Sequence, residues 1–562
     1  YRGYDSWGVS VLNNNSIKTY KTTQNLLEIP KSTLPKANTG IGHTRWATHG
    51  HVTQNNAHPH YSSDKTFVLA QNGIVENFSE LKHFLTEEDF AFKTETDTEV
   101  IVKLIEHYKK DSINFKEAVT KAFKKLKGRN TIIILTTNNT VIAIKNGSPL
   151  VVGLKNDEIF FSSDALSFSD HTNKTIILDD MEMVHFDGNK LGFIDLNTKK
   201  VIHKQPLKLN LHDQNIDKEG FEHFMLKEIA EQPNALIAAT SYSLQDLRPA
   251  LELIKTSKKV FTVGAGTASY AAGQVAYYLR SLAYINAISL KSYEVSEYKD
   301  IFDENSVLVV FSQSGETADT LEALEFAKQK NAKVISLVNM VGSTISRRSD
   351  LEYYLRVGPE ICVVSTKAFC GMLAWGYLLA KSLNGKFDEA KNNIEETSEK
   401  LEKMLSDDFH IQIKQLAENL IDKERMFVLG RGQNFNIAKE GALKIKETSY
   451  KHAEAFSAGE LKHGVIALIE EGVPVICLVS EDDQKNRVLN AASEVKARKG
   501  FLIGIAKENH ENFDQFIKTH NLGDLDAVSI IIPFQLLAYY MSVLERHNPD
   551  KPRNLAKSVT VS

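Results

Sequence analysis

The sequence predicts an α+β domain of antiparallel sheets, followed by two α/β domains with doubly wound parallel sheets. In residues 1–207, short apolar runs recur roughly every 8–12 residues, which is typical of antiparallel sheets. After a polar stretch, apolar runs alternate with longer helical patterns, which favours parallel sheets. Residues 259–266 and 425–432 are each an apolar run ending in Gly-x-Gly. This repeat indicates two copies of one domain.

The changes in pattern place the boundaries. We expect the antiparallel domain over 1–207, a linker over 208–224, the α/β copies over 225–395 and 396–550, and a C-terminal tail over 551–562. Strands of the first domain are expected at 131–135, 141–144, 158–161 and 175–178, and a helix at 98–109.

The composition is that of an ordinary globular protein. The chain has 562 residues, 42% of them hydrophobic and 25% charged, and a net charge of −4, which gives no reason to expect nucleic acid. Its three cysteines form neither a metal-ligand spacing nor a disulfide framework, which indicates a reducing cytoplasm. The apolar segment 529–544 is too short to span a bilayer, and we expect a buried helix there instead.

One turn of the first α/β copy predicts a site for a phosphate ester. An apolar strand at 307–311 leads into Ser312, Gln313, Ser314, Gly315, Glu316 and Thr317, and a helix is expected from residue 318. Unpaired N–H groups and the helix dipole favour an anion at such a helix start. The alternative is that the hydroxyls only cap the helix. The second copy has carboxylates at 481–483, so we expect no phosphate site there.

The two Gly-x-Gly turns are incomplete forms of the dinucleotide-binding motif, so a dinucleotide cofactor is disfavoured. Neither turn completes Gly-x-Gly-x-x-Gly, because Ser269 and Phe435 occupy the third glycine positions.

Three charged residues of the second copy could perform proton transfer. Glu440, Lys444 and Glu447 are spaced by four and three residues, so a helix would present them on one face. Such a row could hold one carboxylate ready to move a proton; the alternative is a surface ion-pair row. His463 lies beside Gly464 in an expected turn and is a second candidate.

The tail ends in an unusual pattern for a chain terminus. Residues 554–562 include Lys557 and the apolar run Val-Thr-Val, and they lack the bias of a disordered end. A docked and desolvated lysine could form a Schiff base with a carbonyl substrate.

The N-terminal domain contains a group of polar residues that suits an amino-acid substrate. Five histidines lie within residues 43–60, but no acidic residue lies among them, which argues against a metal site. Arg45 could hold a carboxylate, Asn72 and Gly73 could stabilise an oxyanion, and Asp97 could bind an α-ammonium group. The alternative for Asp97 is that it caps the helix that follows.

Together these motifs resemble the glutamine–fructose-6-phosphate aminotransferase (isomerizing) family over almost the whole chain. The residues that carry the resemblance are 2–6, 43–50, 96–99, 227–233, 312–317, 365–369, 459–464 and 554–561. The resemblance implies an N-terminal glutamine amidotransferase domain joined to two sugar isomerase (SIS) domains.

The resemblance also implies the residues that bind the two substrates. Glutamine would be held by Arg2, Arg45, Trp46, Thr48, His49, Gly73 and Asp97. Fructose 6-phosphate would be held by Thr267, Ser312, Gln313, Ser314, Thr317, Val363, Ser365 and Ala556.

By the same resemblance, the catalytic residues receive separate roles. His463 would open the sugar ring, Lys557 would form an imine, and Glu447 would move a proton with the help of Lys444 and Glu440, while Asn72 and Gly73 would form the oxyanion hole. No cofactor and no metal is implied. Ammonia would pass through the protein, with Trp46 as gate. In this family the histidine comes from a second subunit, which implies a homodimer.

Two departures from the family stand out. The family's nucleophile is a cysteine upstream of Arg2, and the chain starts at Tyr1, so we expect a truncated N-terminus and no glutamine hydrolysis by the chain as given. Ala268 stands where the family has a serine that contacts phosphate, and Ser269 is the nearest substitute. The rival hypotheses are an ammonia-dependent hexosamine-phosphate isomerase or deaminase, and a sugar-phosphate-binding module without catalysis.

Overall fold

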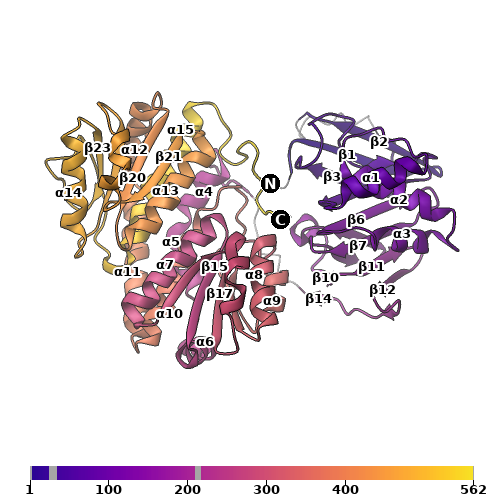
Figure 1. The fold of residues 1–562 in the computed structure, drawn as a ribbon, viewed down its shortest axis with the longest axis horizontal. Helices are drawn as coiled ribbons and strands as arrows, with labels where there is room; N and C mark the ends of the chain where they lie inside the picture. Colours follow the sequence, from indigo (N-terminus) through magenta and orange to yellow (C-terminus); the bar gives the residue numbers. More distant parts are fainter. Residues whose placement is uncertain (1–2, 25–33, 209–216, 561–562) are drawn as a thin grey trace. The chain divides into compact units, whose positions relative to one another are not determined.

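The computed structural model describes residues 3–24, 34–208 and 217–560 (Figure 1). The expected linker at 208–224 therefore lies partly outside the described residues, and so does Arg2. The chain forms two compact units: one holds the residues up to Gln214 with those from Ser558 onward, and the other spans Asn215–Lys557.

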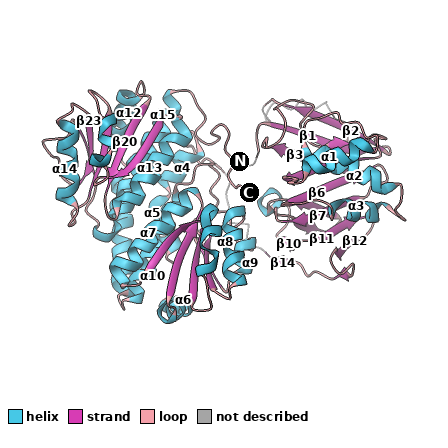
Figure 2. Ribbon diagram, in the orientation of Figure 1, coloured by secondary structure: helices cyan, strands magenta, loops and turns pink. Residues whose placement is uncertain are grey.

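The first unit consists of antiparallel sheets and helices (Figure 2). Its sheets have the orders β13-β12-β11-β7-β6-β5-β4, β14-β10-β8-β9 and β2-β1-β3. The strands are β1 (Ser6–Asn13), β2 (Ser16–Thr22), β3 (Thr39–Arg45), β4 (His60–Tyr61), β5 (Phe67–Gly73), β6 (Asn130–Thr136), β7 (Val141–Asn146), β8 (Val151–Lys155), β9 (Glu158–Ser162), β10 (Lys174–Ile177), β11 (Glu182–Phe186), β12 (Leu191–Asp195), β13 (Val201–Ile202) and β14 (Leu207–Lys208). The helices are α1 (Phe78–Glu87), α2 (Asp97–Lys109) and α3 (Phe115–Phe123), with a 3-10 turn η2 (Ala165–Phe168). The antiparallel fold expected for this part is confirmed.

The core of the first unit fixes the start of α2 against the end of β5. Ile101 and Leu104 of α2 belong to the same buried cluster as Leu69 of β5 and Ile132 of β6. These residues are apolar where the helix and the strands face each other, so burying them stabilises this pairing. Asp97 at the start of α2 is held close to the residues that follow β5.

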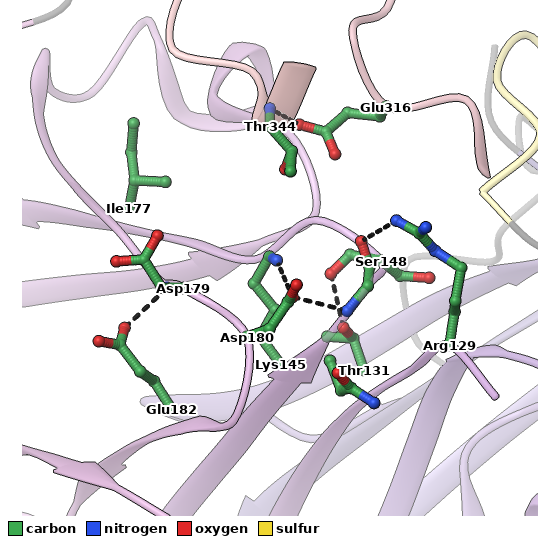
Figure 3. A network of polar contacts seen from close by, with 12 residues as sticks. Arg129, Thr131, Lys145, Ser148, Ile177, Asp179, Asp180, Glu182, Glu316 and Thr344 are labelled. Atoms are coloured by element: carbon green, nitrogen blue, oxygen red, sulfur yellow. Dashed lines mark hydrogen bonds and ion pairs between the residues drawn. The ribbon is translucent and has the colours of Figure 1, made fainter. Parts of the chain in front are cut away.

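A polar network orders the turn after β7 (Figure 3). The ammonium group of Lys145 is almost fully buried and pairs with the carboxylate of Asp180, which also accepts a hydrogen bond from Gly147 N at 2.7 Å. Thr131 Oγ1 donates to the carbonyl of Ser148 at 2.6 Å. Because an unpaired buried charge is costly, the ion pair is what allows Lys145 to lie inside the unit.

The second unit contains two parallel five-stranded sheets with equivalent strand orders, β16-β15-β17-β18-β19 and β21-β20-β22-β23-β24. The strands are β15 (Lys259–Gly264), β16 (Ala287–Lys291), β17 (Ser306–Ser312), β18 (Lys333–Val338), β19 (Leu351–Tyr354), β20 (Arg425–Gly430), β21 (His452–Ser457), β22 (Pro474–Val479), β23 (Phe501–Ala506) and β24 (Gln515–Lys518). The matching orders confirm the doubly wound α/β fold.

Helices surround both sheets of the second unit. They are α4 (Phe224–Ala230), α5 (Gln232–Ala239), α6 (Leu244–Thr256), α7 (Gly266–Ala283), α8 (Ala318–Gln329), α9 (Thr344–Arg348), α10 (Lys367–Leu383), α11 (Phe387–Met404), α12 (Asp407–Leu420), α13 (Asn434–Ser449), α14 (Lys485–Lys496) and α15 (Asp526–Leu544). The 3-10 segments are η3 (Ser292–Ile301), η4 (Leu461–His463), η5 (Val465–Leu468) and η6 (Gly523–Leu525).

The apolar helix α15 belongs to the core of the second unit. Among the described residues it is the one helix whose length and composition would suit a membrane span, and most of it is buried inside the protein. It packs tightly against α13: a Cβ added to Gly441 would lie 2.6 Å from the ring of Phe534. Glycine at this position therefore lets the two helices approach and fixes the orientation of α13.

Candidate functional site

The turn between β17 and α8 uses its hydroxyl groups to shape its own backbone. Ser312 Oγ accepts a hydrogen bond from Gly315 N at 3.0 Å and lies 3.5 Å from Thr317 Oγ1. Thr317 is the N-cap residue of α8, but its side chain makes no capping hydrogen bond. The capping alternative is therefore not what this helix start shows. Ser312 is buried and Gln313 is half-buried.

The same turn is clamped to the start of α9. Gly315 has a φ of +64°, and a Cβ at this position would lie 2.0 Å from Ser343 Oγ. Glu316 accepts a hydrogen bond from Thr344 N at 2.7 Å (Figure 3), and Ile345 N donates to Gly315 O at 3.0 Å. The positive φ and the close approach both require glycine at position 315.

The start of α7 carries polar groups that bond one another and the end of β16. Ser269 Oγ donates to the carbonyl of Gly266 at 2.6 Å and accepts a hydrogen bond of 2.6 Å from Lys291 Nζ. The hydroxyl of Ser269 is thus engaged within the protein. Ala268, the position of the family's serine, is half-buried.

The charged row of α13 lies inside the protein and not on its surface. Lys444 Nζ is 2.6 Å from Glu447 Oε2 and 3.3 Å from Glu440 Oε1, and the Lys444 and Glu440 side chains have no exposed area. Thr267 of α7 accepts a hydrogen bond from Lys444 at 2.9 Å and donates one to Glu440 at 3.1 Å. The surface ion-pair alternative is therefore wrong, and the row bridges the two α/β copies.

Burial gives the three groups different proton affinities. It raises the pKa of Glu440 to about 8, although the Lys444 ammonium opposes this effect. Burial alone would lower the pKa of Lys444, but the carboxylates of Glu440 and Glu447 raise it above its ordinary value. The Glu447 side chain remains 20% exposed, so it is the carboxylate of the row that a ligand can reach.

The C-terminal tail docks into the second unit through a buried ion pair. Lys557 Nζ lies 2.6 Å from Glu360 Oε2, and the two side chains are 5% and 0% exposed. Upstream, Asp550 O accepts a hydrogen bond from Val363 N at 3.1 Å, and Arg553 N donates to Tyr450 OH at 2.9 Å. The lysine is therefore held in the interior, as a Schiff-base role requires.

Hydrogen bonds through Asn339 connect the hydroxyl turn to the segment that carries Glu360, the partner of Lys557. Asn339 N donates to Gln313 O at 3.1 Å, and Asn339 Nδ2 donates to Gly358 O at 2.7 Å. Gly358 precedes Glu360 by two residues. The expected ligands Val363, Ser365 and Ala556 are half-buried in the same unit.

His463 lies in η4 and is exposed. Its expected role requires an imidazole ring that reaches the sugar. Within the described residues, no side-chain contact joins His463 to the hydroxyl turn, to the charged row of α13 or to Lys557.

The expected glutamine site of the first unit shows an ordered arginine. Arg45 is 3% exposed, and its guanidinium donates to the carbonyls of His49, Gly50 and His51, the last two at 3.0 and 3.2 Å. Arg45 therefore supports the loop that carries His49. Trp46 and His49 are half-buried and Thr48 is exposed.

Asn72 and Gly73 end β5. Asn72 Oδ1 lies 2.9 Å from His43 Nε2, so a proton on this nitrogen would direct the Asn72 amide N–H₂ away from the histidine. Gly73 has a φ of +136°, and a Cβ there would lie 2.0 Å from Arg129 O. Sequence reasoning gave His43 no role of its own. Its ring belongs to a column of three histidine rings: the centroids of His43 and His58 are 4.4 Å apart, and those of His58 and His60 are 4.9 Å apart.

Asp97 makes contact with the segment after β5. Its carboxylate accepts a hydrogen bond from Val75 N at 2.8 Å, and burial raises its pKa despite that bond. Asp97 is the first residue of α2 and not its N-cap; the N-cap residue is Thr96, whose side chain makes no capping hydrogen bond.

The three cysteines are unsuited to nucleophilic catalysis. Cys362, Cys370 and Cys477 are buried in the second unit, and burial raises the pKa of each thiol above its ordinary value. A high pKa keeps a thiol protonated and unreactive.

Comparisons with known proteins agree with the architecture. A glutamine amidotransferase domain model matches residues 43–170, and a SIS domain model matches 253–382 and 419–544. The glutamine–fructose-6-phosphate aminotransferase [isomerizing] of Pyrococcus horikoshii is 38% identical over 573 aligned residues, which cover all of this chain and 96% of that protein. The chain belongs to the glutamine–fructose-6-phosphate aminotransferase (isomerizing) family.

Other members of the glutamine–fructose-6-phosphate aminotransferase family show the same relation. The protein of that name from Caldanaerobacter subterraneus is 37% identical, over all of this chain and 96% of that protein. The solved C-terminal domain of glucosamine-fructose-6-phosphate aminotransferase from Francisella tularensis is 32% identical, with a TM-score of 0.55, over 60% of this chain and 100% of that chain. The resemblance found in the sequence motifs is thus confirmed.

Proposed function

We propose that the chain makes D-glucosamine 6-phosphate and L-glutamate from D-fructose 6-phosphate and L-glutamine. The observation that carries this proposal is the buried Lys557, held in the unit that also contains the hydroxyl turn and the charged row of α13. A binding module without catalysis would need neither an interior amine nor a buried carboxylate–ammonium–carboxylate row.

The hydroxyl turn binds the sugar phosphate. Turn N–H groups and hydroxyls offer donors to an anion at the start of α8. The residues assigned to the sugar are Thr267, Ser312, Gln313, Ser314, Thr317, Val363, Ser365 and Ala556. Thr267 also bonds Lys444 and Glu440, which supports a role in linking substrate binding to the charged row.

Lys557 forms an imine with the sugar carbonyl, and Glu447 transfers the proton between C1 and C2. Glu447 suits this role because it is partly exposed and the Lys444 ammonium holds it in place at 2.6 Å. Glu440, with a pKa of about 8, holds Lys444 from the opposite side. His463 opens the ring, contributed by a second subunit in a homodimer, which its exposure supports.

The first unit supplies ammonia from glutamine. Asn72 and Gly73 form the oxyanion hole, and glutamine is bound by Arg2, Arg45, Trp46, Thr48, His49, Gly73 and Asp97, with Trp46 gating ammonia. This activity needs the family's N-terminal cysteine. The proposed domain limits are those expected from the sequence, and free buried thiols support a cytoplasmic location.

The direct test is hydrogen exchange at C1 of fructose 6-phosphate in deuterated water, with ammonia-dependent formation of glucosamine 6-phosphate as second readout. Glu447→Gln should lower exchange by a factor of about 100 or more, because general acid–base catalysis is lost. Glu454→Gln is the matched control, since Glu454 lies on β21 and pairs with the exposed His452. Normal exchange in Glu447→Gln would refute the assignment.

A further inference from the structure

Glu360 is the carboxylate that contacts the tail lysine. Its Oε2 lies 2.6 Å from Lys557 Nζ, and its Oε1 accepts hydrogen bonds from Thr366 N at 2.9 Å and Ala368 N at 3.1 Å. Both backbone donors belong to the start of α10. One oxygen of Glu360 is therefore anchored to the fold, and the other is directed at the amine.

A second buried carboxylate supports the segment next to Glu360. Glu228 Oε1 accepts hydrogen bonds from Ile361 N and Cys362 N at 2.5 and 3.1 Å. Its Oε2 has no hydrogen-bond partner within the part of the chain that the structure describes. Glu228 thus holds the two residues that follow Glu360, from the end of α4.

The two carboxylates differ in charge. Burial and the negative charge of Glu360 raise the pKa of Glu228 to about 8, which keeps Glu228 neutral at neutral pH. Burial would also raise the pKa of Glu360, but the Lys557 ammonium outweighs this effect and holds it below the ordinary value. One negative charge therefore remains in the pair, and it lies on the residue that contacts Lys557.

The described residues offer Lys557 no other carboxylate within ion-pair distance. Glu447 is bound at 2.6 Å by Lys444, and Glu231 is bound at 2.6 Å by Lys367. A lysine must lose a proton before it can attack a carbonyl, since only the neutral amine is a nucleophile. Its proton therefore has one near acceptor in this structure.

We propose that Glu360 is a catalytic base that takes the proton of Lys557 for imine formation, and that Glu228 is a positioning residue that holds Glu360 in place. The proposal rests on the proposed function, since it requires an imine at Lys557. It assigns a role to two residues for which sequence reasoning gave none.

The Lys557 ammonium gives one proton to the Glu360 carboxylate, and the neutral amine attacks C2 of the open-chain sugar. The C=O electron pair moves to the oxygen, which takes the second proton from the nitrogen. Glu360 then returns its proton as the C–O bond breaks and water leaves. The nitrogen keeps one proton as the iminium, and Glu360 is again a carboxylate.

A merely structural ion pair is the alternative, because Glu360 also ties the tail to α10. The two roles differ in what they affect. A tail anchor affects sugar binding and stability, whereas a base affects the rate of imine formation with bound sugar and can be replaced by a diffusible carboxylate.

The experiment measures borohydride trapping of fructose 6-phosphate on the full chain, together with sugar affinity by calorimetry. In Glu360→Gln, which keeps the size and one acceptor oxygen, the trapping rate should fall about 100-fold while affinity stays within about threefold. Glu231→Gln is the matched control: it removes the contact of a half-buried carboxylate with the buried Lys367, which does not involve Lys557. Its trapping rate should equal that of the unmodified chain.

Glu360→Ala provides a second variant in which added formate can occupy the space of the lost carboxylate. Restored trapping of Glu360→Ala by formate supports the proposal, and it does so even if Glu360→Gln binds the sugar poorly. Trapping at the original rate in Glu360→Gln, or no effect of formate in Glu360→Ala, overturns it. If the unmodified chain shows no trapping at Lys557, the imine of the proposed function is refuted. If the unmodified chain is trapped at Lys557 and Glu360→Gln is trapped at the same rate, only the role of Glu360 is refuted.

Discussion

Thr267 of α7 accepts a hydrogen bond of 2.9 Å from Lys444 of α13, which joins the two α/β copies at the charged row. Each copy alone would lack part of this cluster, because Thr267 follows β15 and the row follows β20. The repeat therefore places a hydroxyl of one copy against the buried charges of the other. Thr267 supplies hydrogen bonds to the buried Lys444 and Glu440, while the Glu447 carboxylate balances the charge of Lys444.

Replacing Thr267 by valine tests that junction. The variant leaves one donor of the buried Lys444 ammonium unpaired and removes one of the two groups that contact Glu440 Oε1, which should cost on the order of 1–3 kcal/mol in the free energy of unfolding. Exchange at C1 should slow by about tenfold or more, through kcat and not only through KM. Urea unfolding and exchange kinetics measure the two effects. Wild-type values for both would show that the contact has no role.

Glu440 should make stability depend on pH. Its pKa is about 8 in the folded chain and near 4.5 in the unfolded chain. The protonated carboxyl therefore contributes its full stabilisation below pH 4.5, and this stabilisation is lost as the pH rises toward 8. Glu440→Gln keeps the size without the titration. Relative to the unmodified chain, the variant should gain up to about 5 kcal/mol in the free energy of unfolding as the pH rises from 4.5 to 8, because one pKa unit corresponds to about 1.4 kcal/mol. Urea unfolding at a series of pH values measures the difference, and a constant difference would contradict the expectation.

The histidine column of the first unit should have the opposite dependence. Burial lowers the pKa of His43 to about 4 and the pKa values of His58 and His60 well below 6.5. Stability from these neutral rings is present above pH 6.5 and is lost as pH falls through the folded values. Amide hydrogen exchange of β5 and α2 in the full chain should therefore accelerate toward pH 4. His60→Gln should weaken that dependence; an unchanged pH slope would count against the column as its source.

Gly315 should be indispensable for the hydroxyl turn. Gly315→Ala combines a positive φ with a Cβ 2.0 Å from Ser343 Oγ, so phosphate binding should weaken by at least about tenfold. Gly385→Ala is the matched control, because its φ is +74° and a Cβ there meets nothing within 4 Å. The control should lose about 1 kcal/mol of stability and keep its affinity. Calorimetric titration with fructose 6-phosphate compares them, and equal affinity of both variants would remove the special role of Gly315.

The sequence predicted those features that depend on local pattern. The spacing of Glu440, Lys444 and Glu447 suffices to place them on one helix face, and the run before Ser312 suffices to indicate a strand that feeds a turn. The matching Gly-x-Gly turns suffice to indicate the repeat, because equivalent strands carry equivalent sequence.

Other features depend on contacts between distant residues and left no local signal. Glu360 is a single glutamate after a proline, and only the folded chain shows that Lys557 reaches it. Glu228 lies in one of the recognised motifs, but nothing nearby shows that it is buried. For Arg45, local sequence showed a cation but not that the carbonyls of its own loop would take its donors.

Borohydride reduction with labelled fructose 6-phosphate, followed by mass spectrometry of the digested chain, tests most directly whether the interior tail lysine is the imine-forming amine. The label should be found on the peptide that contains Lys557, and Lys557→Arg should abolish it while phosphate affinity remains. Label on a different lysine, or persistent trapping in Lys557→Arg, would contradict the assignment.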